Sequence, residues 1–270
     1  MRHYKIGDVA KLVGLHPETI REYERMGLLG SHVGREENGY RCYTWQTVCR
    51  ILAIRKMRTM GFTLQEIARN YSDYSLEEYR SGMDRNIERL ERELLIQQMT
   101  LDHMREHQAF ARSLPGSLNR CSLRISPEVY MVPFAREETL RQEEGELKTL
   151  RQWARYSFLT RNAAELDVDY ESETASERSI CLAIEAGTAE VLGLSAGRKG
   201  IHRLPQRSVY CAVRRDLQHV LYPETIRSVR QFLRQEHLEP AGAPFFLSAV
   251  SFFERKESRF YSRLYIPVEG

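Results

Sequence analysis

The sequence lacks the features that mark several large classes of protein. No apolar run approaches the roughly 20 residues that a membrane-spanning helix requires, and the first residues are polar, unlike a signal peptide. The five cysteines include no C-x-x-C pair, so neither a zinc knuckle nor a disulfide framework is expected. No Gly-rich phosphate loop, paired carboxylate or nucleophile–base spacing stands out. We therefore expect a cytoplasmic protein that is not an enzyme and has no metal, cofactor or membrane contact.

Charge is distributed unevenly along the chain. The formal net charge of +3 over 270 residues says little by itself. The first 70 residues, however, hold 12 Lys and Arg against 7 Asp and Glu, whereas the rest hold 28 against 30. This basic excess predicts that a polyanion, if one is bound, is held by the N-terminal part. The length suggests two domains.

Proline is absent from a long stretch that begins at Ser75 and reaches Leu114. Ser75 and Glu78 have the spacing of a capping box, and Pro115-Gly116 predicts the end of the helix. Apolar or long side chains recur at coiled-coil spacing, at Tyr79, Met83, Ile87, Leu90, Leu94, Gln97, Leu101, Met104, Gln108 and Ala111. Such a helix is about 60 Å long, so we predict a homodimer paired through residues 75–114. The alternative is a single solvated helix with charged flanks.

Residues 1–74 predict a winged helix-turn-helix domain. An apolar stripe marks a first helix over residues 6–13, Pro17 opens a second, and a tight Gly turn separates them. Asn38-Gly39 predicts a two-stranded wing, and Thr44 opens a third helix with a basic outer face. This combination is typical of DNA-binding domains.

The second helix is expected to present Arg21 and Arg25 outward, with Tyr23 at the rim. Arginine can grip phosphate or read guanine, and tyrosine can donate to phosphate. Glu18 and Glu22 share this face. Their carboxylates either accept a hydrogen bond from a cytosine amino group or only form ion pairs with the neighbouring arginines.

Residues 115–270 predict a second domain that contains a duplication. Residues 147–159 match residues 226–238 at an offset of 79, each within a helix that follows a strand. The expected strands cover 123–132, 209–213, 245–253 and 260–268, and the expected helices cover 137–159 and 223–238. Two such strand-helix-strand-strand units leave a groove, which is a favoured ligand site. The fold class is therefore α+β: a winged head, a long dimerisation helix and a duplicated effector domain.

Five motifs of the head resemble the MerR family of transcriptional regulators: IGDVA (6–10), TIREYE (19–24), GLL (27–29), NGYRCY (38–43) and MGFTLQEI (60–67). The resemblance covers residues 4 to about 112. It implies a homodimer with an antiparallel coiled coil that binds and distorts double-stranded promoter DNA for RNA polymerase. It carries DNA contact onto Arg21, Tyr23, Tyr40, Arg41, Tyr43 and Arg58. Glu22 departs from the family, which usually has an aromatic residue there. Alternatively, Tyr40 and Tyr43 only pack the wing onto the third helix.

The tail resembles the GyrI-like effector-binding domains of the drug-sensing MerR regulators. This resemblance implies a small hydrophobic or aromatic ligand, which in those relatives is often cationic, held here by Tyr222, Phe245, Phe246 and Phe260. The drug sensors have a buried acidic residue at the position that corresponds to Phe245 of this chain. That acid is therefore missing here. Glu171 or Glu185 would have to supply charge instead. The alternatives are that Phe245, Phe252 and Phe253 are core residues, that the tail is an enzyme, or that the chain senses a metal, for which it offers only Cys121 near the end of the long helix.

Overall fold

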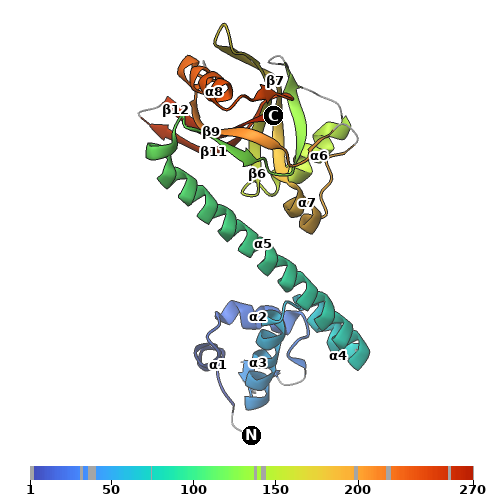
Figure 1. Ribbon diagram of the computed structural model, residues 1–270. Coiled ribbons are helices and arrows are strands. Elements are labelled where there is room, and N and C mark those ends of the chain that lie inside the picture. Colours follow the sequence, from blue (N-terminus) through green and yellow to red (C-terminus); the bar gives the residue numbers. More distant parts are fainter. Residues whose placement is uncertain are drawn as a thin grey trace. The chain divides into compact units, whose positions relative to one another are not determined.

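The computed structural model describes residues 3–30, 33–35, 41–73, 75–136, 139–140, 144–197, 200–216, 220–254 and 257–269. Packing divides the chain into two compact units, Met1–Leu95 and Ile96–Gly270, which are described separately below. Helix α5, Leu76–Ser117, contributes to both (Figure 1).

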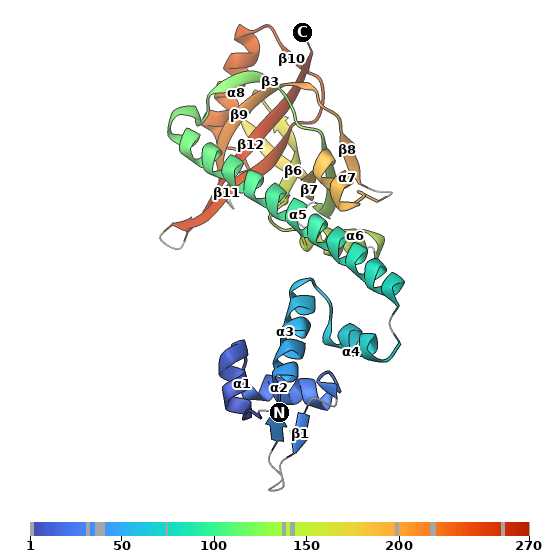
Figure 2. The ribbon, with the colours of Figure 1, turned by 90° about the horizontal axis from the view of Figure 1, so that it is seen from below.

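The first unit is a helix-turn-helix with a wing, as the sequence predicts (Figure 2). Its elements are α1 (Ile6–Val13), α2 (Pro17–Arg25), β1 (Val33–Arg35), β2 (Arg41–Tyr43), α3 (Trp45–Thr59) and α4 (Leu64–Asp73). Gly14 ends α1 in the left-handed region at φ 65°, which a residue without a Cβ adopts at little cost. The two wing strands pair antiparallel, and the predicted Asn38-Gly39 turn lies outside the described residues.

Arginines of α3 hold the head together through backbone carbonyl groups. Arg50 Nε donates to Leu28 O at 2.9 Å, Arg55 Nη1 donates to Val13 O, and Arg58 Nη1 donates to Phe62 O at 2.9 Å. Each acceptor lies just at or beyond a helix end, where carbonyl groups lack helical partners. Arg55 and Arg58 are nevertheless exposed, as expected for the outer face of the third helix, while Arg50 is partly buried.

Helix α5 begins where it was expected and ends later. Ser75 and Glu78 form the capping box, with Glu78 N to Ser75 Oγ at 3.2 Å and Ser75 N to Glu78 Oε2 at 2.8 Å. Pro115 does not stop the helix, which continues to Ser117. The missing N–H of Pro115 falls in the last turn, where Ser117 Oγ donates to Ser113 O and the backbone N of Leu118 still reaches Leu114 O. The helix end predicted at Pro115-Gly116 is therefore wrong, because residues 115–117 are helical.

The first turns of α5 belong to the head core and not to a coiled-coil seam. Tyr79 and Met83 pack against the buried cluster of the head, and the Tyr79 ring stacks on Phe62 with centroids 5.8 Å apart. The predicted seam is therefore corrected at its first two positions.

The second unit is built on a sheet of ten strands, counted within the described residues. Its helices after α5 are α6 (Glu144–Ala154), α7 (Ala186–Leu192) and α8 (Pro223–Gln235). Its strands are β3 (Cys121–Ile125), β4 (Val129–Arg136), β5 (Thr139–Leu140), β6 (Thr160–Asp169), β7 (Thr174–Glu185), β8 (Ile201–Arg203), β9 (Arg207–Arg215), β10 (Glu239–Pro240), β11 (Phe245–Glu254) and β12 (Glu257–Glu269).

The sheet order shows the duplication. The main path runs β3-β9-β12-β11-β6-β7-β4-β5, so β4-α6-β6-β7 and β9-α8-β11-β12 form equivalent units that meet through β6 and β11. The junction is short and antiparallel, with Phe246 opposite Ala164 at its centre. Adding the predicted offset of 79 to the residue numbers of β4 gives positions within β9. The order of strands therefore agrees with the repeat found in the sequence. Trp153 and Phe232, at matching helix positions, both pack into cores.

Three details of the tail differ from the sequence expectation. The strand predicted at 123–132 is two strands, β3 and β4, which are separated at Ser126-Pro127 and pair with different neighbours. The helix predicted at 137–159 is shorter, because residues 139–140 pair with β4 and residues 155–159 form turns. The β6–β7 hairpin follows from the predicted strand-helix-strand-strand repeat, but its residues were not predicted from the sequence.

The arginine contacts within the head lead to a stability prediction. Replacing Arg55 by Met leaves the Val13 carbonyl without its guanidinium donor and should lower the free energy of unfolding by about 1–2 kcal/mol. Urea unfolding of the full chain, followed by circular dichroism, measures this change. Lys56→Met, one residue along the same helix at an exposed position, is the control and should change stability by less than about 0.5 kcal/mol. Equal effects of the two variants would contradict the role assigned to Arg55.

Candidate functional site

The exposed face of α2 carries a cluster of two arginines and one glutamate. Arg21 Nη1 lies 2.9 Å from Glu18 Oε2, and Arg25 Nη2 lies 3.1 Å from Glu18 Oε1. The hydrogen bond from Arg21 is the main cause that lowers the pKa of Glu18. All three side chains remain about half exposed or more, so these contacts are weak and can exchange for phosphate.

The tyrosines expected at this surface are buried. Tyr23 is 5% exposed and Tyr43 is fully buried, and both belong to the core of the head. The rim position predicted for Tyr23 is therefore wrong, and the burial of Tyr43 matches the alternative that it packs the wing onto the head. Tyr40 lies outside the described residues. Sequence periodicity failed here because both faces of a short helix can be covered by neighbouring elements.

Arg41 and Arg58 remain at the surface of the head. Arg41, on the wing, donates from Nε to Glu24 Oε1 of α2 at 2.8 Å, which ties the wing to the second helix. Arg58 is exposed although its Nη1 atom is bonded to Phe62 O. Three of the six predicted DNA-contact residues, Arg21, Arg41 and Arg58, are thus exposed side chains of the head.

The four predicted ligand residues of the tail are not brought together. Phe245 is 1% exposed and packs with Tyr210 and Tyr265, whereas Phe246 is 2% exposed and belongs to the core beneath α8. Successive residues of a strand point to opposite faces, so these two rings cannot share a pocket. Tyr222 precedes α8, and its hydroxyl donates to Asp216. Phe260, near the start of β12, is partly buried.

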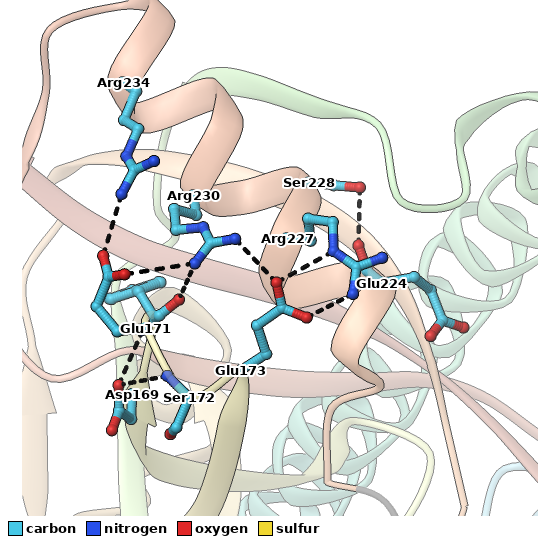
Figure 3. Close-up of polar contacts among 10 residues, drawn as sticks. Asp169, Glu171, Ser172, Glu173, Glu224, Arg227, Ser228, Arg230 and Arg234 are labelled. Carbon is cyan, nitrogen blue, oxygen red and sulfur yellow. Dashed lines mark hydrogen bonds and ion pairs between the residues drawn. The ribbon is translucent and has the colours of Figure 1, made fainter.

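The carboxylates proposed to supply negative charge are bound by arginines. Glu171 lies 3.1 Å from Arg234 of α8, and neighbouring Glu173 lies 2.6 Å from Arg227 (Figure 3). Glu185 lies 3.1 Å from Arg161. The turn after β6 is therefore fastened to the helix of the other repeat mainly through Glu173, whose side chain is 18% exposed, whereas the Glu171–Arg234 pair is largely exposed and weak.

A cavity of about 620 Å³ lies between the second half of α5 and the junction of the two repeats. Its lining comes from α5, the turn after α6, the start of β6, β7 and β11: His103, Met104, His107, Ala154, Ser157, Phe158, Thr160, Arg161, Asn162, Leu182, Ser248, Ala249 and Ser251. The volume is within the range of small-molecule sites. Sequence reasoning missed this site, because its residues come from distant segments and share no motif.

Arg161 and His103 give the cavity its polar wall. Arg161 Nη2 contacts Glu106 at 2.8 Å, Glu185 at 3.1 Å and His103 Nδ1 at 3.2 Å. A guanidinium can only donate, so Nδ1 of His103 accepts and its proton is on Nε2. Burial, followed by the charge of Arg161, lowers the pKa of His103 to about 4. His103 is therefore a neutral donor at pH 7.

The head matches a known family model, that of the MerR HTH family regulatory proteins, over residues 4–73. The HTH-type transcriptional regulator CueR of Escherichia coli is 34% identical over 116 residues, which cover 43% of this chain and 82% of CueR. The chain belongs to the MerR family. It is a family of transcription regulators, not of enzymes.

Two further proteins are similar to this chain over a shorter stretch or at lower sequence identity. The MerR-family mercuric resistance operon regulatory protein of Bacillus cereus is 48% identical over 64 residues, 24% of this chain, and the chain spans about half of its length (48%). The cryo-EM structure of an EcmrR–DNA complex aligns with 98% of this chain and 99% of EcmrR, at 16% identity and a TM-score of 0.35.

Within the described part of the chain, no group of three or more His, Cys, Asp or Glu side chains could hold a metal ion. Among the same residues, no helix combines the length and hydropathy needed to cross a bilayer.

The lowered pKa of His103 predicts a pH dependence of stability. The unfolded chain takes up a proton near pH 6.5, whereas the folded chain resists protonation until about pH 4, so stability falls as the pH drops between these values. His103→Gln should remove about 1–2 kcal/mol of this fall, after allowance for the partial exposure of the ring. Urea unfolding at pH 7 and pH 4.5 measures it. The same pH dependence in both proteins would contradict the assignment of a buried neutral imidazole.

Proposed function

We propose that the chain is a dimeric, ligand-responsive transcription regulator. Residues 1–74 bind and distort double-stranded promoter DNA, residues 75–114 pair two copies, and residues 115–270 hold a small hydrophobic or aromatic molecule. RNA polymerase is the partner at the promoter, and the protein acts in the cytoplasm. These assignments follow the MerR family membership together with the surfaces described above.

The observation that carries the DNA-binding part is the exposed arginine pair on α2. Arg21 and Arg25 lie on the second helix of a helix-turn-helix, and Arg41 extends from the wing beside it. The second helix of such motifs enters the major groove, and arginine binds both phosphate and guanine there. Arg58 is a further proposed contact. Tyr23 and Tyr43 are buried in the core of the head and are not proposed as DNA contacts.

The dimer proposal rests on apolar residues of α5 that are exposed to solvent in the single chain. Five large side chains between 41% and 68% exposed recur at intervals of three, four and seven residues: Ile87, Leu90, Leu94, Leu101 and Met104. This is the repeat of a coiled-coil seam, which a second helix would cover. Leaving such a row in water is unfavourable, at about 25 cal/mol per Å² of apolar surface.

The ligand proposal connects the tail to the helix that carries the seam. His103, Met104 and His107 of α5 line the cavity, so a ligand there contacts the helix directly. Met104 also belongs to the exposed row on α5. A ligand that favours one arrangement of α5 would shift the dimer between two DNA-bound states, a coupling typically worth 1–3 kcal/mol.

Glu18 provides a test of the DNA-binding face. In Glu18→Gln the carboxylate no longer holds Arg21 and Arg25 or repels phosphate, so affinity for DNA should rise by about three- to tenfold and fall more steeply with salt. Binding is measured on duplexes that the unmodified chain has selected from a random-sequence library.

The comparison variants are Arg21→Ala and Arg80→Ala. Arg21→Ala should weaken binding by about tenfold or more, while Arg80→Ala, an exposed arginine on α5, should have little effect. Weaker binding by Glu18→Gln with altered base preference would instead support acceptance from a cytosine amino group, and the proposed release of the arginines would be wrong.

A further inference from the structure

We infer that Cys121 and Cys211 form a redox site, at which a hydroperoxide converts the two thiols into a reversible disulfide. This inference goes beyond the proposed ligand-responsive function and does not depend on it. It follows from the register of β3 and β9, from the surroundings of the two sulfur atoms, and from the place where β3 follows α5.

The two cysteines lie directly opposite each other on neighbouring antiparallel strands, in a register that is unbroken over β3. Five positions further along β3, the backbone N of Ser126 donates to Gln206 O at 2.9 Å, which makes these two residues a hydrogen-bonded pair in the same register. Hydrogen-bonded and non-hydrogen-bonded pairs alternate, so Cys121 and Cys211 form a non-hydrogen-bonded pair. The Cα atoms of such pairs are about 4.5 Å apart, which is within the range that a disulfide spans.

The two thiols share the face of the sheet that α8 covers. Cys211 is fully buried in the core cluster beneath α8, and Cys121, on the edge strand, is partly exposed and packs against the same cluster. A hydrogen bond with the Cys211 thiol lowers the pKa of Cys121, and the same contact, together with burial, raises the pKa of Cys211. The Cys211 thiol also lies 3.7 Å from Ala212 O, so it keeps its proton. Cys121 is therefore the thiol that ionises first and that solvent reaches.

These roles match the two steps of disulfide formation by a hydroperoxide. The Cys121 thiolate attacks an oxygen of the hydroperoxide, the O–O bond breaks, and the leaving oxygen takes up the proton that Cys121 released, so that Cys121 becomes a sulfenic acid. Cys211 then attacks the Cys121 sulfur, the S–O bond breaks, and the hydroxyl group leaves as water with the Cys211 proton. The thiols lose two electrons, and the hydroperoxide is reduced to an alcohol and water.

The other three cysteines lie elsewhere in the fold. Cys42 and Cys49 belong to the first compact unit, and Cys181 is buried in a different core cluster of the sheet from Cys211. Cys49 is exposed on a helix, where it has no cross-strand partner. It therefore serves as the reference for a thiol that oxidant can reach but that is not held opposite another.

The cysteine pair lies close to the end of the long helix. α5 ends at Ser117, and Asn119 N donates to Ala212 O, beside Cys211, at 2.8 Å. The side chain of Asn119 also accepts from Thr225 Oγ1 of α8 at 2.7 Å. A disulfide would join the strand that follows α5 covalently to the sheet. In a reducing compartment such a bond is transient, which is typical of redox sensing.

Thiol mapping of the full chain tests this inference. We would reduce the chain, remove the reductant under nitrogen, add hydrogen peroxide at pH 7, block the remaining thiols with N-ethylmaleimide in urea, and map the peptides by mass spectrometry. Two of the five thiols should be lost, with the peptides of Cys121 and Cys211 joined, and dithiothreitol should restore both. A chain oxidised while unfolded in urea should give mixed pairings, because the native register is then absent.

Three results of this mapping would overturn the inference. They are retention of all five thiols, a main product that joins any other pair of cysteines, and oxidation of Cys121 to a sulfinic acid without a link to Cys211.

Single variants test the role of each sulfur atom. Cys211→Ser should stop the reaction at a sulfenic acid on Cys121, which dimedone labels, whereas Cys121→Ser should leave Cys211 unlabelled. Cys49→Ser, the matched control, should form the Cys121–Cys211 disulfide as the unmodified chain does. Labelling of Cys211 in Cys121→Ser would contradict the assigned roles, and if a variant does not fold, the mapping of the unmodified chain still decides the inference.

Discussion

The structure depends on one helix whose two ends are buried in different cores. The first turns of α5 pack through Tyr79 and Met83 into the head, and Phe110, near its end, is 5% exposed against Ala212 and Val250 of the sheet. Between them the helix exposes a row of large apolar side chains. Burial at both ends fixes the register of α5 within each unit, and the exposed middle is what a second copy would cover. A change at the cavity beside residues 103–107 therefore acts on the same helix that begins in the head.

Arginine serves mainly as an internal connector in this chain. In the head it bonds to carbonyl groups at helix ends, and in the tail it pairs with acids across the two repeats. Its planar fork and permanent charge suit both tasks better than lysine does. The basic excess of the first 70 residues is therefore not a measure of DNA-binding surface, since part of that charge is used within the fold. Arginine plays the same part in the tail, where guanidinium groups lie over aromatic rings and form ion pairs with the carboxylates.

Local patterns predicted the parts of the fold that depend on local interactions. The limits of α1, the opening of α2 at Pro17, the wing strands and the Ser75–Glu78 cap are all as expected, because caps and turns are decided within a few residues. The duplication could also be predicted from the sequence, because the two repeats have identical residues at equivalent positions of their helices. What failed depends on long-range contacts: the burial of Tyr23, the carbonyl contacts of Arg50 and Arg55, and the cavity. Pro115 was misjudged because a proline near a helix C-terminus removes only one hydrogen bond.

The central claim is that the exposed row on α5 is a pairing surface, and the mass of the unmodified chain in solution tests it most directly. Sedimentation equilibrium at micromolar concentration should give twice the chain mass of 31.6 kDa. A Leu94→Glu chain, with a charge in the middle of the row, should shift toward the single mass. A single 31.6 kDa species for the unmodified chain, or a dimer that Leu94→Glu leaves intact, would contradict the account.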